Sequence, residues 1–272
     1  MKCRSRLAPF ILTVSILGVG CAPTKDHSIR VVRIDPLRVV DLTYEFGADT
    51  IYWPTSQPFR IERVAYGKTP SGYWYAANNI CLAEHGGTHT DAPIHFAEGG
   101  WSAEAIPMSS LIGPAAVIDL RHAAARNPDY LMTVADVLAW ENRYGRLPKG
   151  AIVIAFTGWG RFWGDRRAYL GTDVPGDVQN LHFPGISPEA AKFLVTERDI
   201  AAVGIDTASV DHGPSQDFPA HRILNGANKP VFENVANVEL LPPSGATVLA
   251  LPMKIRGGTG GPTRIIALLP GS

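Results

Sequence analysis

One short run of residues constrains this 272-residue chain more than any other. In the sequence HGGTHTDAPIH, the odd-numbered positions hold three histidines and one aspartate: His85, His89, Asp91 and His95. Such positions share one face of an extended backbone, and the glycines and proline of the run argue against a helix. Imidazole and carboxylate groups on one face are typical ligands of a divalent metal ion. Because the fully extended run is too long to surround a single ion, the chain must bend at its glycines or its proline.

The run has an alternative interpretation as a surface loop with scattered, hydrogen-bonded histidines. A single histidine would favour that interpretation. Three imidazoles around one carboxylate, with glycines that permit close backbone approach, favour the metal site instead.

The spacing of the run also carries a resemblance to a known family. Residues 85–96 resemble the HxGTHxDxPxHF motif of the cyclase family of metal-dependent hydrolases. Residues 49–54 are similar to an early aromatic segment of that family, and residues 218–222 with 232–234 are similar to its late ligand segment.

The resemblance implies one or two divalent ions, zinc or manganese, and a role for individual residues. In this family the first two motif histidines and the aspartate hold one ion, and the aspartate can bridge to a second ion held by a later histidine and glutamate. The implied ligands are His85, His89, Asp91, His221 and Glu233. His95 is the implied catalytic acid or base, and Trp53 is the implied contact for an aromatic substrate.

The residues themselves leave alternatives open at three of these positions. His221 lies in a short helix-like stretch, where an isolated histidine is usually packed or capping. Glu233 follows two apolar residues, and a carboxylate in such a setting is costly unless it is paired or metal-bound. His95 can move protons, act as a third imidazole ligand, or orient another ligand.

The rest of the sequence predicts an α/β fold, a single domain in which a mixed sheet is flanked by helices. Nearly continuous apolar runs at 115–120 and 151–156 are typical of strands buried on both faces. Thr133 and Asp136 form the pattern of a capping box, which opens a helix that ends near Gly145.

Other segments complete this prediction. A second helix begins after Ser187, which Pro188 follows. Further strands are predicted at 29–34, 37–42, 201–205, 247–255 and 263–269. The glycine-rich turn at 257–262 lacks the strand-loop-helix context of a phosphate site, so we interpret it as a hairpin loop.

The N-terminus has the pattern of an export signal. Basic residues precede the apolar stretch 7–20, which is short for a permanent membrane span. This stretch ends at Cys21 in a sequence that resembles a bacterial lipobox, and an ordinary cleaved signal is the alternative. We therefore expect a signal peptide at 1–21, a tether at 22–30, a catalytic domain at 31–272, and an exported protein in the periplasm or on a membrane through a lipid at Cys21.

Composition limits the partners and the chemistry. The 25 basic and 25 acidic residues cancel, so nothing indicates a nucleic-acid or anionic-membrane surface. Cys81 is the only thiol of the mature chain, which excludes an internal disulfide, and its apolar surroundings predict a buried side chain. The family resemblance implies a homodimer.

The predicted function is hydrolysis of an amide bond in a small aromatic amide or lactam by metal-activated water. The first hypothesis is an arylformamidase of the kynurenine formamidase type, and the alternative is a cyclic-amide hydrolase of the isatin hydrolase type. Aromatic residues at 73–75 and 159–163 are candidates for the substrate pocket. A serine hydrolase has little support, because the chain has no GxSxG turn. An exported, non-catalytic metal or solute binder is the third hypothesis, and retention of His95 argues against it.

Overall fold

The computed structural model describes residues 34–271. The predicted signal peptide, the tether and all but the last residue of the strand at 29–34 lie outside the described residues. The chain from Ile34 onward forms one compact unit. Within this described part, none of the helices has the length and apolarity that crossing a membrane requires.

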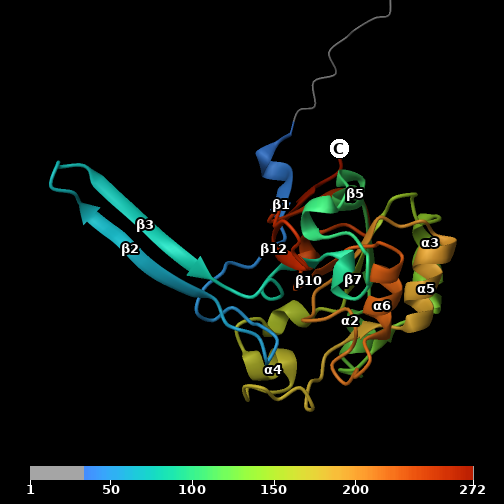
Figure 1. Ribbon diagram of the computed structural model, residues 1–272. Helices are drawn as coiled ribbons and strands as arrows, with labels where there is room; N and C mark the ends of the chain where they lie inside the picture. The colour runs from blue at the N-terminus through green and yellow to red at the C-terminus, as the bar shows by residue number, and fades with distance from the viewer. Residues whose placement is uncertain (1–33, 272) are drawn as a thin grey trace, which may run out of the picture. The chain divides into compact units, whose positions relative to one another are not determined.

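The centre of the fold is a mixed sheet of eight strands (Figure 1). Their order across the sheet is β1 (Val39–Asp41), β12 (Gly260–Leu268), β11 (Ser244–Pro252), β5 (Ile112–Asp119), β7 (Ile152–Phe156), β9 (Ala202–Ile205), β10 (Val231–Glu233) and β4 (His89–Asp91). Strands β5, β7, β9 and β10 run parallel, and the other pairs are antiparallel. Because β4 pairs with β12 as well as with β10, all of these strands except β1 close into a barrel.

Three helices, α3 (Val134–Tyr144), α5 (Pro188–Glu197) and α6 (Pro219–Gly226), cover one side of this barrel (Figure 1). The shorter helices are α1 (Met108–Leu111), α2 (Arg121–Ala124) and α4 (Arg166–Leu170). In β7, Ile152 and Ile154 belong to a cluster with side chains from around the barrel, whereas Val153 and Ala155 pack with α3, α5 and α6. The alternation explains the continuous apolar run of this strand, since both of its faces are buried.

Several predicted elements are confirmed. The capping box of Thr133 and Asp136 opens α3, and Gly145 follows its last residue with a φ of 90°. Ser187 caps α5 by accepting a hydrogen bond from the N–H of Ala190. The glycine-rich turn does join the antiparallel pair β11 and β12. The strand predicted at 37–42 is shorter, because a 3-10 turn at Pro36–Arg38 precedes β1.

A long hairpin, β2 (Arg60–Lys68) with β3 (Trp74–Cys81), extends away from the barrel and was not predicted (Figure 1). Its side chains are almost all exposed. The prediction of a buried Cys81 is therefore wrong, since this thiol is exposed in β3. The aromatic residues at 73–75 are also on the hairpin and more than half exposed, so they do not line the cavity described below. A short β-pair, β6 (Leu131–Met132) with β8 (Gly185–Ile186), completes the strands.

Candidate active site

The short strand β4 places the first two ligand candidates. His89 and Asp91 are two residues apart in β4, so their side chains share a face. The register of β10 sets Glu233 directly opposite His89. The predicted bends in the motif are also present. The chain turns at Gly87, whose φ is +56°, between His85 and β4, and it turns again in the 3-10 helix Pro93–His95, which ends at His95. The expectation that one extended face carries all four side chains therefore holds only for the pair in β4.

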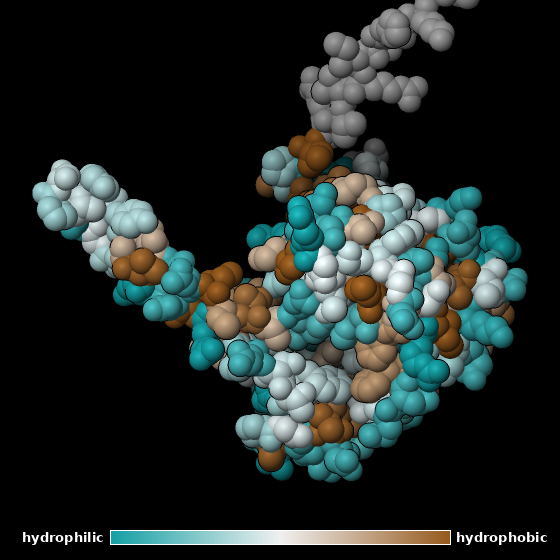
Figure 2. Space-filling view, in the orientation of Figure 1, coloured by the Kyte–Doolittle hydropathy of each residue, from teal (hydrophilic) through white to brown (hydrophobic). Residues whose placement is uncertain are grey.

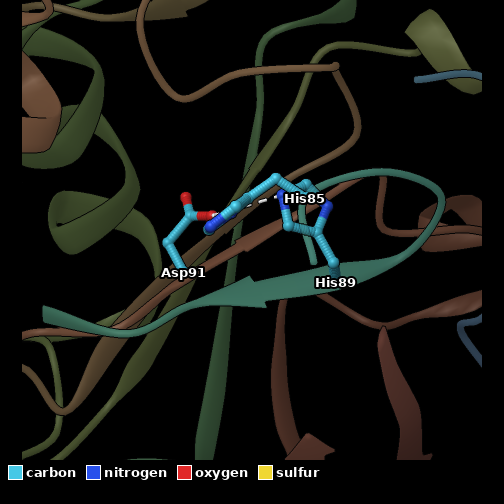
Figure 3. A group of neighbouring side chains, drawn as sticks. All are labelled: His85, His89 and Asp91. Carbon is cyan, nitrogen blue, oxygen red and sulfur yellow. Dashed lines mark hydrogen bonds and ion pairs between the residues drawn. The ribbon is translucent and has the colours of Figure 1, made fainter. Parts of the chain in front are cut away.

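Asp91 is the centre of the site. It is completely buried, and its Oδ1 lies 2.6 Å from Nδ1 of His85 and 3.2 Å from Nε2 of His89. Figure 3 shows these three side chains turned toward one another from β4 and the loop before it. The other oxygen, Oδ2, lies 3.1 Å from Nε2 of His221, which α6 supplies.

Glu233 completes the cluster. Its Oε1 lies 3.2 Å from Nε2 of His221, and its Oε2 lies 3.4 Å from Nε2 of His89. The ligand atoms fall into two groups of three that could each hold an ion, one formed by His85, His89 and Asp91 and the other by Asp91, His221 and Glu233. The structure thus brings together all five residues that the sequence predicted as ligands, and Asp91 is shared by both groups.

The outer nitrogens of two histidines have fixed partners. Nδ1 of His89 donates to the carbonyl of Gly87 at 3.0 Å, and Nδ1 of His221 lies 2.7 Å from Oδ2 of Asp211. Because a carbonyl oxygen and a carboxylate can only accept, each Nδ1 carries a proton, and Nε2 is the atom of each ring that faces the cluster and would bind an ion. Asp211, which the sequence analysis did not include among the site residues, thus orients a ligand candidate.

Other residues around the ligands were missed from the sequence. The side-chain amide of Asn234 donates to the Gly87 carbonyl at 2.7 Å, and the hydroxyl of Thr88 donates to the Asn234 carbonyl at 2.7 Å. Asn234 itself has a φ of +51°, in the left-handed region that asparagine adopts more readily than most other residues. These bonds tie the loop before β4 to the end of β10, so they hold His89 and Glu233 in register.

The electrostatics of the cluster favour a cation. Burial opposes ionisation of Asp91, but hydrogen bonds from His221, His85 and His89 hold its pKa well below the usual range. Burial and the charge of Asp91 raise the pKa of Glu233. Burial also opposes protonation of His221, yet Asp211 and Asp91 raise its pKa well above the usual value. The two buried carboxylates form ion pairs with histidines alone, so the cluster attracts positive charge. Its nitrogen and oxygen donor atoms suit a divalent metal ion.

His95 differs from the other histidines. It belongs to neither ligand group among the described residues, and its ring stacks on His85 with 3.8 Å between centroids. Burial lowers the pKa of His95 to about 4, and neighbouring imidazoles add to this effect. At neutral pH the ring is therefore uncharged and has a lone pair that can accept a proton.

The five ligand candidates line part of a cavity with a volume of about 250 Å³. His95 lines it, and so do the aromatic rings of Trp53, Phe96 and Phe218. The ring centroid of Phe218 lies 6.1 Å from that of Trp53 and 5.4 Å from that of Phe96. Phe218 has a φ of +49° at the start of α6, and strain of this kind is common at functional sites. The cavity therefore offers an aromatic wall facing the ligand cluster.

The aromatic residues in the loop at 159–163 were expected to line the substrate pocket, and that expectation is wrong. Trp159 is buried and donates through Nε1 to the carbonyl of Tyr169, and Trp163 stacks on Tyr44. These aromatic side chains pack beneath the loop instead of lining the cavity. Phe96 and Phe218 line the cavity instead. Both lie in the motif segments, Phe96 next to His95 and Phe218 three residues before His221, which is the signal that could have identified them.

Comparison with known proteins agrees with this geometry. The model of the Cyclase family matches residues 40–212. The chain belongs to the cyclase family. It is 35% identical over 208 residues to the isatin hydrolase of Roseibium aggregatum, an alignment that covers 73% of this chain and 77% of that protein.

Two further relatives extend the comparison of this cyclase-family chain. A kynurenine formamidase from Sphingopyxis alaskensis is 25% identical over 231 residues, or 84% of this chain and 97% of that protein. A solved isatin hydrolase, bound to the product analogue thioisatinate, superimposes with a TM-score of 0.76 at 32% identity, over 86% of this chain and 92% of that one. The predicted α/β fold of the cyclase family is thereby confirmed.

Asp211 gives a direct test of the ligand geometry. Its carboxylate accepts from the backbone N–H groups of Ala220 and His221 and from the His221 ring. In Asp211→Asn, an amide N–H₂ replaces one acceptor and faces donors, so we expect metal affinity to fall by about 10- to 100-fold. Competition with a chromophoric chelator measures this. The exposed Asp217→Asn is the matched control, and equal affinities in the two variants would contradict the assigned role.

Proposed function

We propose that this chain hydrolyses the carbon–nitrogen bond of a small aromatic amide, with a cyclic amide of the isatin type as the preferred substrate. The observation that carries this proposal is the cluster of buried ligands at the base of an aromatic-walled cavity. The 35% identical relative is an isatin hydrolase, and the thioisatinate complex shows that a solved homologue binds a small aromatic acid. This support reverses the order of the sequence hypotheses, in which arylformamidase came first.

Each group of the site has a distinct task in this reaction. When bound, a divalent ion would supply a water whose pKa is lowered to about 7, and it would polarise the amide carbonyl. His85, His89, Asp91, His221 and Glu233 would hold one or two such ions, either zinc or manganese. The aromatic rings of the cavity stack on the planar substrate, and Trp53 is the proposed main contact.

His95 is the proposed acid and base. Its uncharged ring lines the cavity beside the ligands, so it can accept the proton of the attacking water. The resulting imidazolium then gives the proton to the nitrogen that leaves when the carbon–nitrogen bond breaks. The product of a cyclic amide opened in this way is an amino acid in which the amine and the carboxylate stay on one molecule.

Cleavage of an aryl formamide is the second candidate. The same attack on an acyclic amide releases formate and an arylamine, and it needs the same ligands and proton carrier. The kynurenine formamidase relative, aligned over 84% of this chain, favours this candidate. The two substrates differ in whether the cleaved amide bond is part of a ring, so the ratio of their kcat/KM values distinguishes the two candidates.

A His95 variant tests the proposed chemistry. We expect the wild-type chain to hydrolyse isatin with a higher kcat/KM than N-formylkynurenine, and His95→Ala to lower kcat by at least about 100-fold because the proton carrier is lost. The exposed His122→Ala is the matched control. Metal content is measured on all three proteins. A wild-type protein that binds metal but hydrolyses neither amide would favour a binding protein, and loss of metal in His95→Ala would make this residue a ligand.

We also infer a homodimer in which the β2–β3 hairpin lies against a second copy of the chain. Large apolar side chains are more than half exposed along both strands, namely Ile61, Val64, Tyr66, Trp74, Tyr75 and Ile80. Figure 2 shows brown apolar patches partway along the projecting arm, among white and teal surface. An isolated two-stranded hairpin is marginally stable in water, and this one is about 30 Å long, so two arms exchanged about a two-fold axis can cover each other's apolar surface.

Polar substitutions on the hairpin test the dimer. Ile61 and Ile80 pair across the strands and are both exposed, so replacing both by threonine keeps strand propensity while removing apolar surface. We expect sedimentation velocity to show a dimer for the wild-type chain and a monomer for this variant. Val174→Thr, which changes an exposed residue outside the hairpin, should leave the dimer intact. A monomeric wild-type chain would contradict the inference.

Export and lipid anchoring at Cys21 are proposed from the N-terminal sequence alone. In a bacterial host, the wild-type chain should fractionate with membranes and incorporate labelled fatty acid. Cys21→Ser should abolish the labelling, because serine offers no thiol for lipid attachment. Equal labelling of the two chains would exclude Cys21 as the lipid site, and an unlabelled wild type would favour the ordinary signal peptide.

A further inference from the structure

The glycine-rich turn between β11 and β12 is in contact with the candidate metal site. A Cβ added at Gly260 would meet the backbone carbonyl of Thr90 and would approach Cε1 of His85 to 2.6 Å. A Cβ at Gly258 would come within 2.9 Å of the Glu84 carboxylate. These glycines therefore let the turn lie against the His85 ring and the residue before it. A hairpin loop alone would not require such close contact.

Thr259, in the middle of this turn, connects the two side chains. Its hydroxyl oxygen lies 2.9 Å from Nε2 of His85 and 2.6 Å from Oε2 of Glu84. The backbone N–H of Thr259 donates to the same Glu84 oxygen at 3.0 Å. Its carbonyl accepts from the N–H of Ala92, directly after β4. The turn is thus fixed to the ligand strand and to Glu84 at once.

The donor and acceptor in each of these hydrogen bonds determine which ring nitrogen of His85 faces Thr259 with a proton. A carboxylate only accepts, so the Thr259 hydroxyl donates to Glu84 and keeps its lone pair for His85. Nε2 of His85 must then carry a proton and donate to that lone pair. The other nitrogen, Nδ1, faces the ligand cluster, 2.6 Å from Oδ1 of Asp91, so with Nε2–H held by Thr259 it is the atom whose lone pair an ion would take.

His85 therefore has the reverse orientation of the other two imidazoles. His89 and His221 are held through Nδ1 and present Nε2, whereas His85 is held through Nε2 and presents Nδ1. We propose that Thr259 and Glu84 are positioning residues that select Nδ1 of His85 as the metal-binding atom. This proposal rests on the metal site of the proposed function. It also gives the glycine-rich turn a role in that site.

Two variants of Thr259 separate this role from simple packing. Thr259→Val keeps the shape of the side chain but leaves Nε2–H of His85 without its acceptor, so we expect about 10- to 100-fold weaker binding of zinc or manganese. Thr259→Ser retains the hydroxyl and should restore affinity to within a few-fold of the wild type. Thr196→Val, at an exposed position of α5, is the matched control. Chelator competition on the purified full-length chain measures affinity without any substrate.

Removal of the Glu84 carboxylate tests the hydrogen bond between Thr259 and Glu84. Glu84→Ala leaves the Thr259 hydroxyl free to rotate and donate to His85, and we expect a loss of affinity similar to that of Thr259→Val. The exposed Glu98→Ala is its control. Thermal unfolding of each metal-free variant shows whether it is folded as the wild type is.

A spectroscopic measurement identifies the ligand atom itself. In zinc-loaded protein labelled with ¹⁵N-histidine, we expect the His85 resonances, assigned by their loss in His85→Gln, to show a protonated Nε2 and a metal-bound Nδ1. Coordination through Nε2, or unchanged affinity and spectra in Thr259→Val, would overturn the proposal while leaving the metal site in place. A wild-type chain that binds no metal would overturn both.

Discussion

Burial of two carboxylates at one point is the constraint on which the rest of this structure depends. Asp91 and Glu233 are almost without solvent contact and have histidines as ion-pair partners. Buried anionic groups are costly unless opposite charge and hydrogen bonds offset the lost hydration. The closure of the barrel makes this arrangement possible, because β4 pairs with β10 on one edge and with β12 on the other. A three-residue strand thereby sets the register of the ligands.

Support for the ligands comes from widely separated parts of the chain. A backbone carbonyl holds His89, and the carboxylate of Asp211 holds both the His221 ring and the first N–H groups of α6. The cavity then adds an aromatic wall on the open side of the cluster. Charge is thus concentrated at the base of the pocket and apolar surface at its walls, which suits a flat amide whose carbonyl must reach the ligands.

The sequence predicted those parts of the fold and site that depend on local patterns. The capping box at Thr133, the helix after Ser187 and the buried strand β7 follow from propensity and periodicity over a few residues. The ligand set followed from a motif and a family resemblance. The closure of the barrel did not, because strand pairing between β4, β10 and β12 joins segments more than a hundred residues apart. The contact of Thr259 with His85 depends on the same long-range pairing, whereas the role of Asp211 depends on the loop that leads into α6.

The exposed hairpin shows a second limit of sequence patterns. Its aromatic residues suggested a substrate pocket, since composition alone does not distinguish a pocket wall from a surface that meets another molecule. The most direct test of the account is the metal content of the purified chain, together with isatin hydrolysis before and after chelation. The account predicts one or two divalent ions per chain, loss of turnover when they are removed, and recovery when zinc or manganese returns. Full turnover by a metal-free chain would contradict it.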